Sequence, residues 1–385
     1  MRRLLPLATT AVLVTGLAAI TSTAALASPG RTAGHRAASG PEVIATGLDK
    51  PRGLAIGPHG ALYVAEAGRG GAGPCVPGPF GEACYGPSGA ITRIGHHGQE
   101  RIVTGLSSFA SPDGGLAFGP HDIALSSPGG AHEGHGSRWR HSRRHHHASA
   151  YVTVGACFTP NDTCGRLLQL TGHGGWRTVA DLNAFELQNN PDGLHPGESD
   201  PYAVLALRGR QIVADAAGND LLRVARDGRI SVLAVFPQRP VLDPTGASVL
   251  MDFVPTSIAV GPDGALYVGQ LTGAPFPVGG ARVYRLGPGG ATTVFADGFT
   301  NIIDIAFARD GSLLVLEMAK NSLASGDPAG DLIRIAPDGS RETVLEDGLV
   351  SPSAVAIGRD GALYIANHGQ EAGVGEVLRF RAPRH

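Results

Sequence analysis

Short apolar strands recur along the chain, and each is followed by a polar turn. The first strand of each copy reads PRGLAI (51–56), PHDIAL (120–125), PYAVLA (201–206), PTSIAV (255–260), IIDIAF (302–307) and PSAVAI (352–357). A tight turn such as Pro262-Asp263-Gly264 follows most copies, and then a second strand such as ALYVG (265–269). Asp-Gly adopts the positive φ angles of a hairpin turn, and β-branched and aromatic residues favour strands. The pattern therefore predicts six antiparallel repeats.

Each repeat continues with a third strand, as in RVYRLG (282–287), and most with a fourth, as in TTVFADGF (292–299). The last repeat has no fourth strand, but EVIATGL (42–48) near the start matches the fourth-strand pattern. An N-terminal strand that completes the last sheet closes a ring and removes its exposed edges. We therefore expect an all-β protein, a six-bladed β-propeller in which the N-terminal strand closes the last blade.

The repeats are longest at three insertions, which fall at 67–88, 126–149 and 183–200. Insertions on a rigid scaffold often carry binding residues, although exposed loops also tolerate added sequence. The second insertion contains HEGHGSRWRHSRRHHHAS (132–149). Its histidines are suited to soft or borderline metals and, once protonated, to polyanions. A loop tip of biased composition is the alternative that we favour.

The first 27 residues are expected to be a secretory signal. Arg2 and Arg3 precede an apolar stretch, and Ala25-Leu26-Ala27 has the small-x-small pattern of a cleavage site. An uncleaved membrane anchor is the weaker alternative, because the apolar run is short and no positive cluster follows it. We expect a flexible mature N-terminus over 28–41, a single propeller domain over 42–385, and a secreted protein outside the cytoplasmic membrane.

Charge and composition exclude some classes of partner. The formal net charge is −2, so no strong field of either sign favours nucleic acid. After the signal, no hydrophobic segment is long enough to span a membrane. We expect a monomer.

The four cysteines form two local pairs, each within a Gly- and Pro-rich loop segment. An even count in an exported protein predicts the disulfides Cys75–Cys84 and Cys157–Cys164. A zinc site is the alternative, but zinc ligands usually come as closer pairs than these.

A polar residue ends most of the second strands. In repeats one, three, four, five and six it is Glu66, Asp215, Gln270, Glu317 and Asn367, whereas repeat two has Val154. Equivalent positions of a propeller lie on one ring, so we place these side chains near one mouth of the central channel. Their oxygens suit one divalent cation such as Ca²⁺, with Glu66, Asp215 and Glu317 as metal ligands, or a hydroxyl-rich ligand. The alternative, which we favour, is that strand ends meet water and prefer polar residues.

The second position of each first strand is also expected to approach the channel. The residues there are Arg52, His121, Tyr202, Thr256, Ile303 and Ser353, and Asp122 and Asp304 come one residue later. Arg52 and His121 are the candidates to bind an anionic substrate. Alternatively, Arg52 pairs with a neighbouring carboxylate.

Several stretches resemble the ScyD/ScyE family of exported propellers with repeats of the NHL and TolB type. They are GPHDIAL (119–125), NNPDG (189–193), VADAAGNDLLRV (213–224), VPTSIAVGPDGALYVGQLTGAPFPVGGARVYRL (254–286) and GFTNIIDIAF (298–307). The resemblance implies a six-bladed propeller outside the cytoplasm, and no particular activity. The chain departs from the family pattern just before Pro201, where the family leads us to expect Asn and Asp200 stands instead.

The leading functional hypothesis is a noncatalytic extracellular scaffold that binds a protein, a glycan or a small molecule. A metal-dependent hydrolase, lactonase or lyase with its site at the central channel is the first alternative. The second is an enzyme like the quinone-dependent sugar dehydrogenases, which share phrases resembling PRGLA (51–55) and DGALYV (263–268). Against it, no clear His/Arg set with a calcium loop matches those enzymes.

Overall fold

The computed structural model describes residues 40–78, 81–113, 115–126, 149–158, 163–194 and 197–381. The expected signal (1–27) and nearly all of the histidine-rich stretch (132–149) lie outside the described residues, so both predictions stay predictions. Gly40–His385 forms one compact unit.

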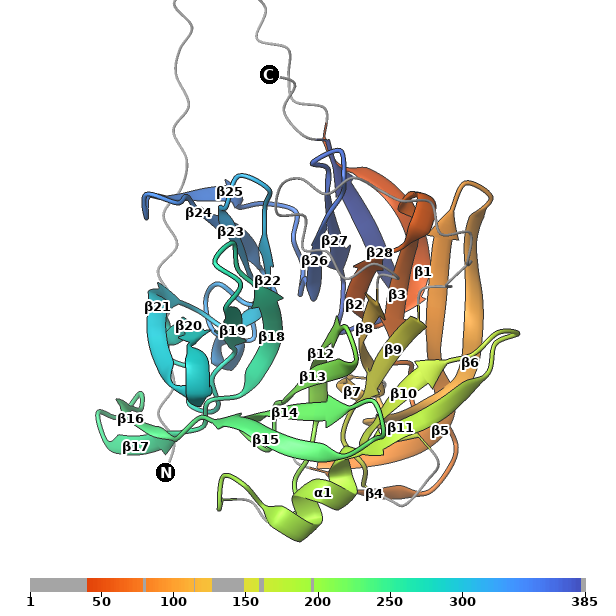
Figure 1. Ribbon diagram of the computed structural model, residues 1–385, viewed down its shortest axis with the longest axis horizontal. Coiled ribbons are helices and arrows are strands. Elements are labelled where there is room, and N and C mark those ends of the chain that lie inside the picture. Colours follow the sequence, from red (N-terminus) through yellow and green to blue (C-terminus); the bar gives the residue numbers. More distant parts are fainter. Residues whose placement is uncertain are drawn as a thin grey trace, which may run out of the picture. The chain divides into compact units, whose positions relative to one another are not determined.

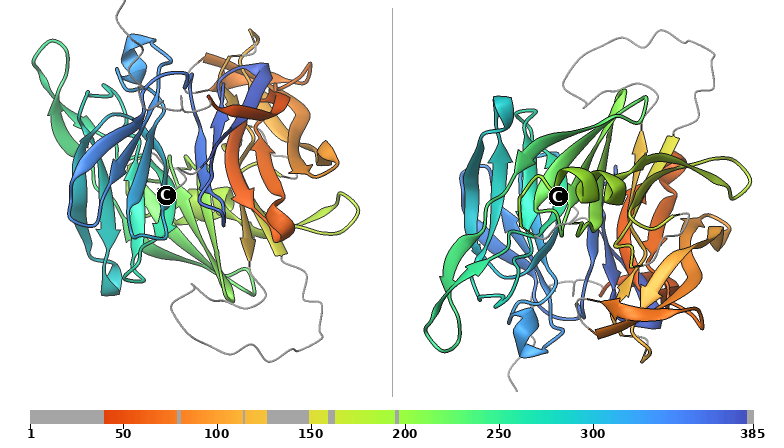
Figure 2. Two further views of the ribbon diagram at one scale, coloured as in Figure 1. Left: turned by 90° about the horizontal axis from the view of Figure 1, so that it is seen from above. Right: turned by 90° about the horizontal axis from the view of Figure 1, so that it is seen from below.

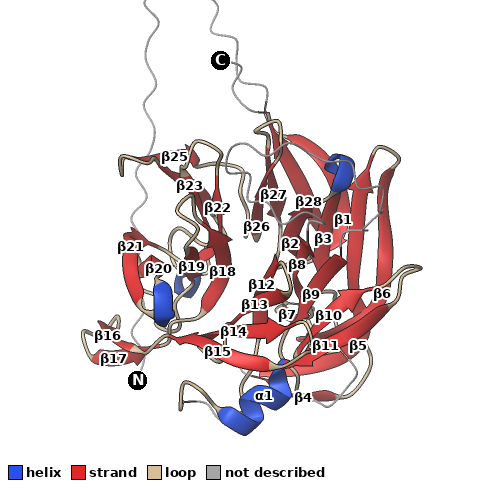
Figure 3. Cartoon of the chain, viewed as in Figure 1, coloured by secondary structure: helices blue, strands red, loops and turns tan. Residues whose placement is uncertain are grey.

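Six antiparallel sheets form the blades (Figures 1 and 3). Blade 1 contains β2 (Pro51–Ile56), β3 (Leu62–Glu66), β5 (Gly81–Gly95) and β6 (Gly98–Ala110), and blade 2 contains β8 (Pro120–Ser126), β9 (Ser149–Val154), β10 (Arg166–Leu170) and β11 (Trp176–Asp181). Blade 3 contains β12 (Pro201–Leu207), β13 (Arg210–Asp215), β14 (Asp220–Ala225) and β15 (Ile230–Val235), and blade 4 contains β18 (Pro255–Val260), β19 (Leu266–Gln270), β20 (Ala281–Leu286) and β21 (Thr292–Phe299). Blade 5 contains β22 (Ile302–Phe307), β23 (Leu313–Glu317), β24 (Asp331–Ile335) and β25 (Arg341–Leu345), and blade 6 contains β26 (Ala354–Ile357), β27 (Leu363–Asn367), β28 (Ala372–Phe380) and β1 (Glu42–Asp49).

The first strands of the blades surround the axis, and each contacts the first strand of the next blade (Figure 1). The ring closes where β1 pairs antiparallel with β28. The Ser353 hydroxyl adds a second link, because it donates a 2.6 Å hydrogen bond to the Pro51 carbonyl. The predicted six-bladed propeller with its N-terminal closing strand is therefore confirmed.

The core lies between the blades, so each second strand is buried on both faces. Tyr267 on β19 packs against Phe307 of blade 5, with ring centroids 4.8 Å apart. The next residue, Val268, belongs to the apolar cluster shared with blade 3. Strands with two buried faces have nearly continuous apolar sequences. This explains why phrases such as ALYVG lack the alternation of a half-exposed strand.

Additional elements lie outside the four-stranded blades (Figure 2). The first insertion forms β4 (Cys75–Gly78), which pairs with the extended β5, and a short β7 (Ala117–Phe118) pairs with β6. The third insertion begins as helix α1 (Leu182–Asn189), which the sequence did not predict. Its N-terminus is capped by the Asp181 carboxylate, which accepts a 2.9 Å hydrogen bond from the Ala184 amide.

A hairpin of β16 (Arg239–Leu242) and β17 (Ser248–Met251) joins blades 3 and 4. The sequence did not single it out, because the spacing there is close to that of an ordinary repeat. Short 3-10 turns form η1 (Pro58–Gly60), η2 (Pro288–Gly290) and η3 (Leu323–Ser325).

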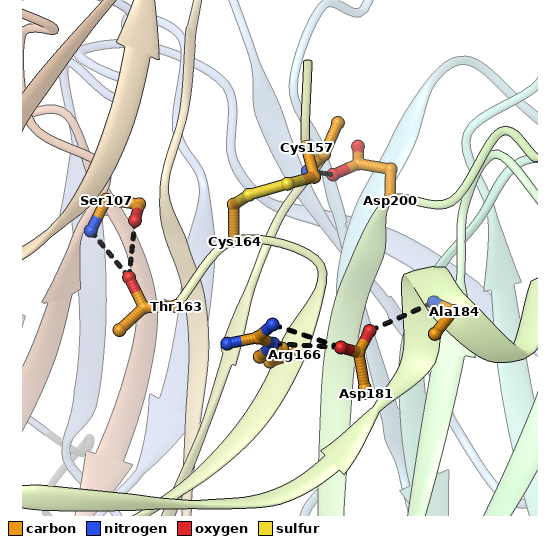
Figure 4. Close-up of a disulfide and its surroundings, with 9 residues drawn as sticks. Ser107, Cys157, Thr163, Cys164, Arg166, Asp181, Ala184 and Asp200 are labelled. Carbon is orange, nitrogen blue, oxygen red and sulfur yellow. Dashed lines mark hydrogen bonds and ion pairs between the residues drawn. A yellow bond between two sulfur atoms is a disulfide. The ribbon is translucent and has the colours of Figure 1, made fainter. Parts of the chain in front are cut away.

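Both predicted disulfides are present. Cys75–Cys84 joins β4 to β5, and Cys157–Cys164 closes the loop between β9 and β10 (Figure 4). Within the described part of the chain, no helix is both long and apolar enough to cross a membrane.

Candidate functional site

Three residues expected at the channel come together on blades 1, 2 and 3. Arg52 lies on β2, His121 on β8 and Tyr202 on β12, and these strands are consecutive around the ring. The rings of His121 and Tyr202 lie 4.7 Å apart. The pKa of Tyr202 responds to Arg52 and also to Asp304 on blade 5. Interaction with a residue of a distant blade indicates that these groups converge on the axis.

Arg52 is the most unusual of these residues. Its side chain is buried, and its Nη2 atom donates a 3.3 Å hydrogen bond to the Ala117 carbonyl. Among the described residues, its Nε atom has no hydrogen-bond partner and no carboxylate forms an ion pair with it. The alternative that Arg52 pairs with a neighbouring carboxylate is therefore not seen. Lys50, also buried, lies near enough for the Arg52 charge to contribute to its lowered pKa.

His121 approaches the carboxylate of Asp200, the residue that departs from the family pattern. The His121 Nδ1 and Asp200 Oδ1 atoms are 3.3 Å apart, without the angles of a hydrogen bond. Asp200 accepts a 2.9 Å hydrogen bond from the Ala156 amide, in the loop closed by the Cys157–Cys164 disulfide (Figure 4). A Cβ atom on Gly155 would lie 2.3 Å from His121 Cε1, so only glycine allows this loop to approach.

Burial controls the protonation of the site. Burial, together with the charge of Arg52, holds the pKa of His121 well below its ordinary value, so the imidazole is neutral at pH 7. Burial and the nearby Asp215 carboxylate raise the pKa of Asp200 to about 7. Burial also raises the pKa of Tyr202 to about 12. The site therefore combines a fixed positive charge with one carboxyl group, that of Asp200, whose pKa lies near neutral pH, and such shifted pKa values are common in functional sites.

Asp122 and Asp304 join neighbouring blades. One oxygen of Asp122 accepts a 2.8 Å hydrogen bond from the Val204 amide of blade 3. One oxygen of Asp304 accepts an equivalent 2.8 Å hydrogen bond from the Val355 amide of blade 6. Burial nevertheless raises the pKa of Asp122 to about 6 and that of Asp304 to about 8. Their hydrogen bonds indicate a role in the architecture of the ring.

Two other channel positions also join blades. The Thr256 hydroxyl donates a 2.8 Å hydrogen bond to the Ile302 carbonyl, which links blade 4 to blade 5. Ser353 makes the corresponding link from blade 6 to blade 1. Ile303 is buried in the apolar cluster between blades 5 and 6. Tyr202 packs against this same cluster, whereas Thr256 and Ser353 bind backbone carbonyls.

The polar residues that end the second strands are buried and bind the backbone. The hydrogen bonds run from Asp49 N to Glu66 Oε2 (2.7 Å), from Asp200 N to Asp215 Oδ1 (2.7 Å), from Thr300 N to Glu317 Oε1 (2.8 Å) and from Val350 N to Asn367 Oδ1 (2.7 Å). Each donor lies just before the first strand of the same blade. A buried amide without a partner is costly. An oxygen-bearing side chain at this position therefore holds the entering loop, and this accounts for its recurrence.

In blade 4, the amides before the first strand bind a side chain of the neighbouring blade. The amides of Phe253 and Val254 both donate to Asn219 Oδ1 at 3.0 Å, so the acceptor comes from blade 3. Gln270 is buried, and its Oε1 atom has no hydrogen-bond partner within the described part of the chain. In blade 2, the equivalent Val154 is buried and apolar.

The structure does not bring Glu66, Asp215 and Glu317 to one point. Glu66 forms a 2.6 Å ion pair with Arg101, and Asp215 accepts a 2.6 Å hydrogen bond from the Ser199 hydroxyl. Among the described residues, one group of His, Cys, Asp and Glu side chains has the spacing of metal ligands, namely Cys75, Glu82 and Cys84. Its two cysteines form a disulfide. The arrangement therefore offers no support for the candidate calcium site.

Sequence reasoning missed a buried acidic cluster beside the site. Glu186 of α1 and Asp215 both face Gly218, where a Cβ atom would lie 3.2 Å from Glu186 Oε1 and 3.3 Å from Asp215 Cγ. Asp220 pairs with Asp215 across the β13–β14 hairpin. Burial, reinforced by the neighbouring carboxylates, raises the pKa of Glu186 to about 8 and that of Asp220 well above its ordinary value. The hairpin register could have revealed Asp220, but not Glu186.

Comparisons with known protein families and with curated proteins gave no match. Among solved structures, a glucose dehydrogenase is 15% identical over 89% of this chain and 100% of its own, with a TM-score of 0.52. A protein described as a gluconolactonase is 14% identical over 90% of this chain and 95% of its own, with a TM-score of 0.50. A Bacteroides thetaiotaomicron protein of unknown function is 11% identical over 89% of this chain and 72% of its own, with a TM-score of 0.53. Likeness at such identity shows the propeller fold alone.

Proposed function

We propose that this protein is an exported, noncatalytic propeller of the ScyD/ScyE type that binds a small anionic ligand near the axis of the ring. The observation that carries the proposal is Arg52, a buried guanidinium without a carboxylate partner among the described residues. A buried charge is costly unless it is paired. An anionic ligand would supply the missing partner.

The neighbours of Arg52 suit such a ligand. A guanidinium binds carboxylate, sulfate or phosphate through two parallel hydrogen bonds. Tyr202 offers a hydroxyl, and its high pKa keeps that hydroxyl a proton donor at neutral pH. The neutral His121 offers an uncharged nitrogen. Burial lowers the pKa of Lys50 to about 8, so a bound anion would favour its charged form.

Export rests on the N-terminal sequence and on the two disulfides, which form in oxidising compartments. The ScyD/ScyE assignment rests on the sequence stretches described above. An extracellular protein or glycan remains an alternative ligand to a small molecule.

The test is thermal unfolding of the purified protein with sulfate, citrate and D-glucuronate as probes. A probe at 100 times its Kd stabilises the folded state by about 2.7 kcal/mol. We expect this stabilisation in the wild type, its loss in Arg52→Gln, and its retention in Arg359→Gln. Arg359 is an exposed arginine in the β26–β27 turn, away from the site. Equal stabilisation of wild type and Arg52→Gln by every probe would refute the proposal.

A channel hydrolase, lactonase or lyase is the second candidate, favoured by the approach of His121 to Asp200. A neutral imidazole beside a carboxyl group can accept a proton from water or from substrate carbon. Lactone hydrolysis that disappears in both His121→Gln and Asp200→Asn, with folding intact, would favour this candidate. The likeness to a glucose dehydrogenase adds no chemical feature to the site, so the quinone-dependent alternative is the least favoured.

A further inference from the structure

A concave site lies between blades 3 and 4, and its lining does not include the Arg52 group. It is a groove of about 840 Å³, and its walls include the turns β12–β13, β18–β19 and β20–β21. Volumes of about 300–1,000 Å³ are typical of sites for small molecules. The groove is therefore large enough to hold one.

The core side chains between blades 3 and 4 are smaller than those between blades 4 and 5. The fourth residue from the end of each second strand is a tyrosine in four blades. These are Tyr63, Tyr151, Tyr267 and Tyr364. In blade 4, Tyr267 fills the space toward blade 5 by packing on Phe307. Ile212 and Val260 occupy the equivalent positions between blades 3 and 4, and both line the groove. Two aliphatic side chains thus stand where blades 4 and 5 have two aromatic rings, and they fill less of the space between the blades.

The chemistry of the groove is amphipathic. Its apolar residues include Leu207, Ile212, Val260 and Leu266, and its charged residues are Arg210, Arg223, Asp263 and Arg285. Asp263 is already paired with Arg285, with the Nε and Oδ2 atoms 2.7 Å apart. The groove thus has more positive than negative charge.

Arg210 and Arg223 are the uncompensated cations. Arg223 lies opposite Ile212 in the β13–β14 ladder, and Arg210 is two residues before Ile212 on the same strand. Side chains two residues apart on a strand share a face. Both arginines therefore project from the face of blade 3 that carries Ile212. Within the described part of the chain neither forms an ion pair, and Arg223 makes only a 3.4 Å hydrogen bond to the Ser231 hydroxyl.

We propose that this groove binds an amphipathic organic anion. Its apolar body lies on the surface around Ile212 and Val260, and its acidic group lies between Arg210 and Arg223. The aliphatic surface gains free energy by burial, and a guanidinium pairs with carboxylate or sulfonate. This site does not depend on the function proposed for the Arg52 group.

The test uses 1-anilinonaphthalene-8-sulfonate as a fluorescent probe, titrated onto the purified full chain. Decanoate and decanol serve as competitors with the same apolar chain and different head groups. We expect saturable binding that decanoate displaces and decanol displaces at least tenfold less well, because decanol cannot pair with the arginines. Equal competition by the two would overturn the assignment of an anion site.

Two variants fill the groove with the side chains that other blades use. Ile212→Tyr restores the residue of blades 1, 2, 4 and 6, and Val260→Phe restores the residue of blade 5. Each should raise the Kd of the probe at least tenfold while the circular dichroism spectrum stays that of the wild type. Unchanged affinity in a folded variant would overturn the proposal.

The double variant Arg210→Gln/Arg223→Gln tests the charge without altering the core, because both arginines are exposed. It should weaken binding about tenfold and reduce its salt dependence. Arg359→Gln is the matched control and should bind as the wild type does. The Arg52→Gln variant should also bind this probe normally, which separates a failure here from a failure of the channel proposal. Unchanged affinity in the double variant would overturn the role of the arginines.

Discussion

Glu317 offers a direct test of what the polar strand-end residues do. Its side chain is buried on β23, and its Oε1 atom accepts a 2.8 Å hydrogen bond from the Thr300 amide. It also faces Asp331 across the β23–β24 ladder. Burial, and then the charge of Asp331, raise the pKa of Glu317 to about 8. At pH 6 the carboxyl is therefore protonated and acts as a neutral acceptor.

Replacement by alanine removes the acceptor for a buried amide. An unsatisfied buried donor costs about 1–3 kcal/mol. The lost methylene adds about 0.8 kcal/mol, so Glu317→Ala should lower the free energy of unfolding by about 2–4 kcal/mol. The unfolding entropy of about 2.1 cal/mol/K per residue corresponds to about 0.7 kcal/mol per degree for a domain of this length. The expected decrease in Tm is therefore about 3–6 °C.

Glu317→Gln is the matched control, since its amide oxygen can still accept from Thr300. At pH 6 it should unfold within about 0.5 kcal/mol of the wild type, a typical limit for a change that breaks no interaction. Urea unfolding and calorimetry measure both variants. Equal destabilisation by alanine and glutamine, or none by either, would refute the loop-holding role. A calcium ion held by Glu66, Asp215 and Glu317 would instead raise the wild-type Tm in CaCl₂ relative to EDTA, and Glu317→Gln would abolish that increase.

Three further predictions follow from the same structure. The raised pKa of Glu186, about 8, means that the folded protein binds more protons than the unfolded chain, so its contribution to stability falls as pH rises from about 4.5 to 8. Glu186→Gln should therefore flatten the pH dependence of urea unfolding, and an unchanged slope would contradict the assignment. Replacing Cys157 and Cys164 by serine should cost about 2–3 kcal/mol of stability. The same change should weaken probe binding at the Arg52 site, because the loop next to this disulfide supplies the Ala156 amide that binds Asp200. Replacing Cys75 and Cys84 by serine is the matched control and should leave probe binding unchanged. Ser353→Ala should lower the free energy of unfolding by about 1–3 kcal/mol by leaving the buried Pro51 carbonyl without this donor, and a change within error would show that the link is dispensable.

The candidate site was only partly accessible to sequence reasoning. The positions of Arg52 and His121 could be found because equivalent strand positions recur in every blade. Asp200 appeared only as a departure from a family pattern. Its approach to His121 depends on the loop around Gly155, which lies elsewhere in the chain. Such a contact is decided by the packing of blades 2 and 3.

The repeated strands, their turn glycines and the unpaired N-terminal strand determined the propeller, the number of blades and its closure. These are local patterns, and each repeat contains the information for its own blade. The sequence also determined both disulfides, because each pair lies within one loop.

The tertiary structure decided what the conspicuous side chains do. Glu66, Asp215, Glu317 and Asn367 resemble a ligand-binding ring when aligned, yet each accepts a hydrogen bond from a backbone amide just before the first strand of its own blade. Arg52 resembles an ordinary ion-pair residue, yet it is buried without a carboxylate among the described residues. Partners and burial depend on how distant blades meet around the axis, and a pattern within one repeat does not contain that information.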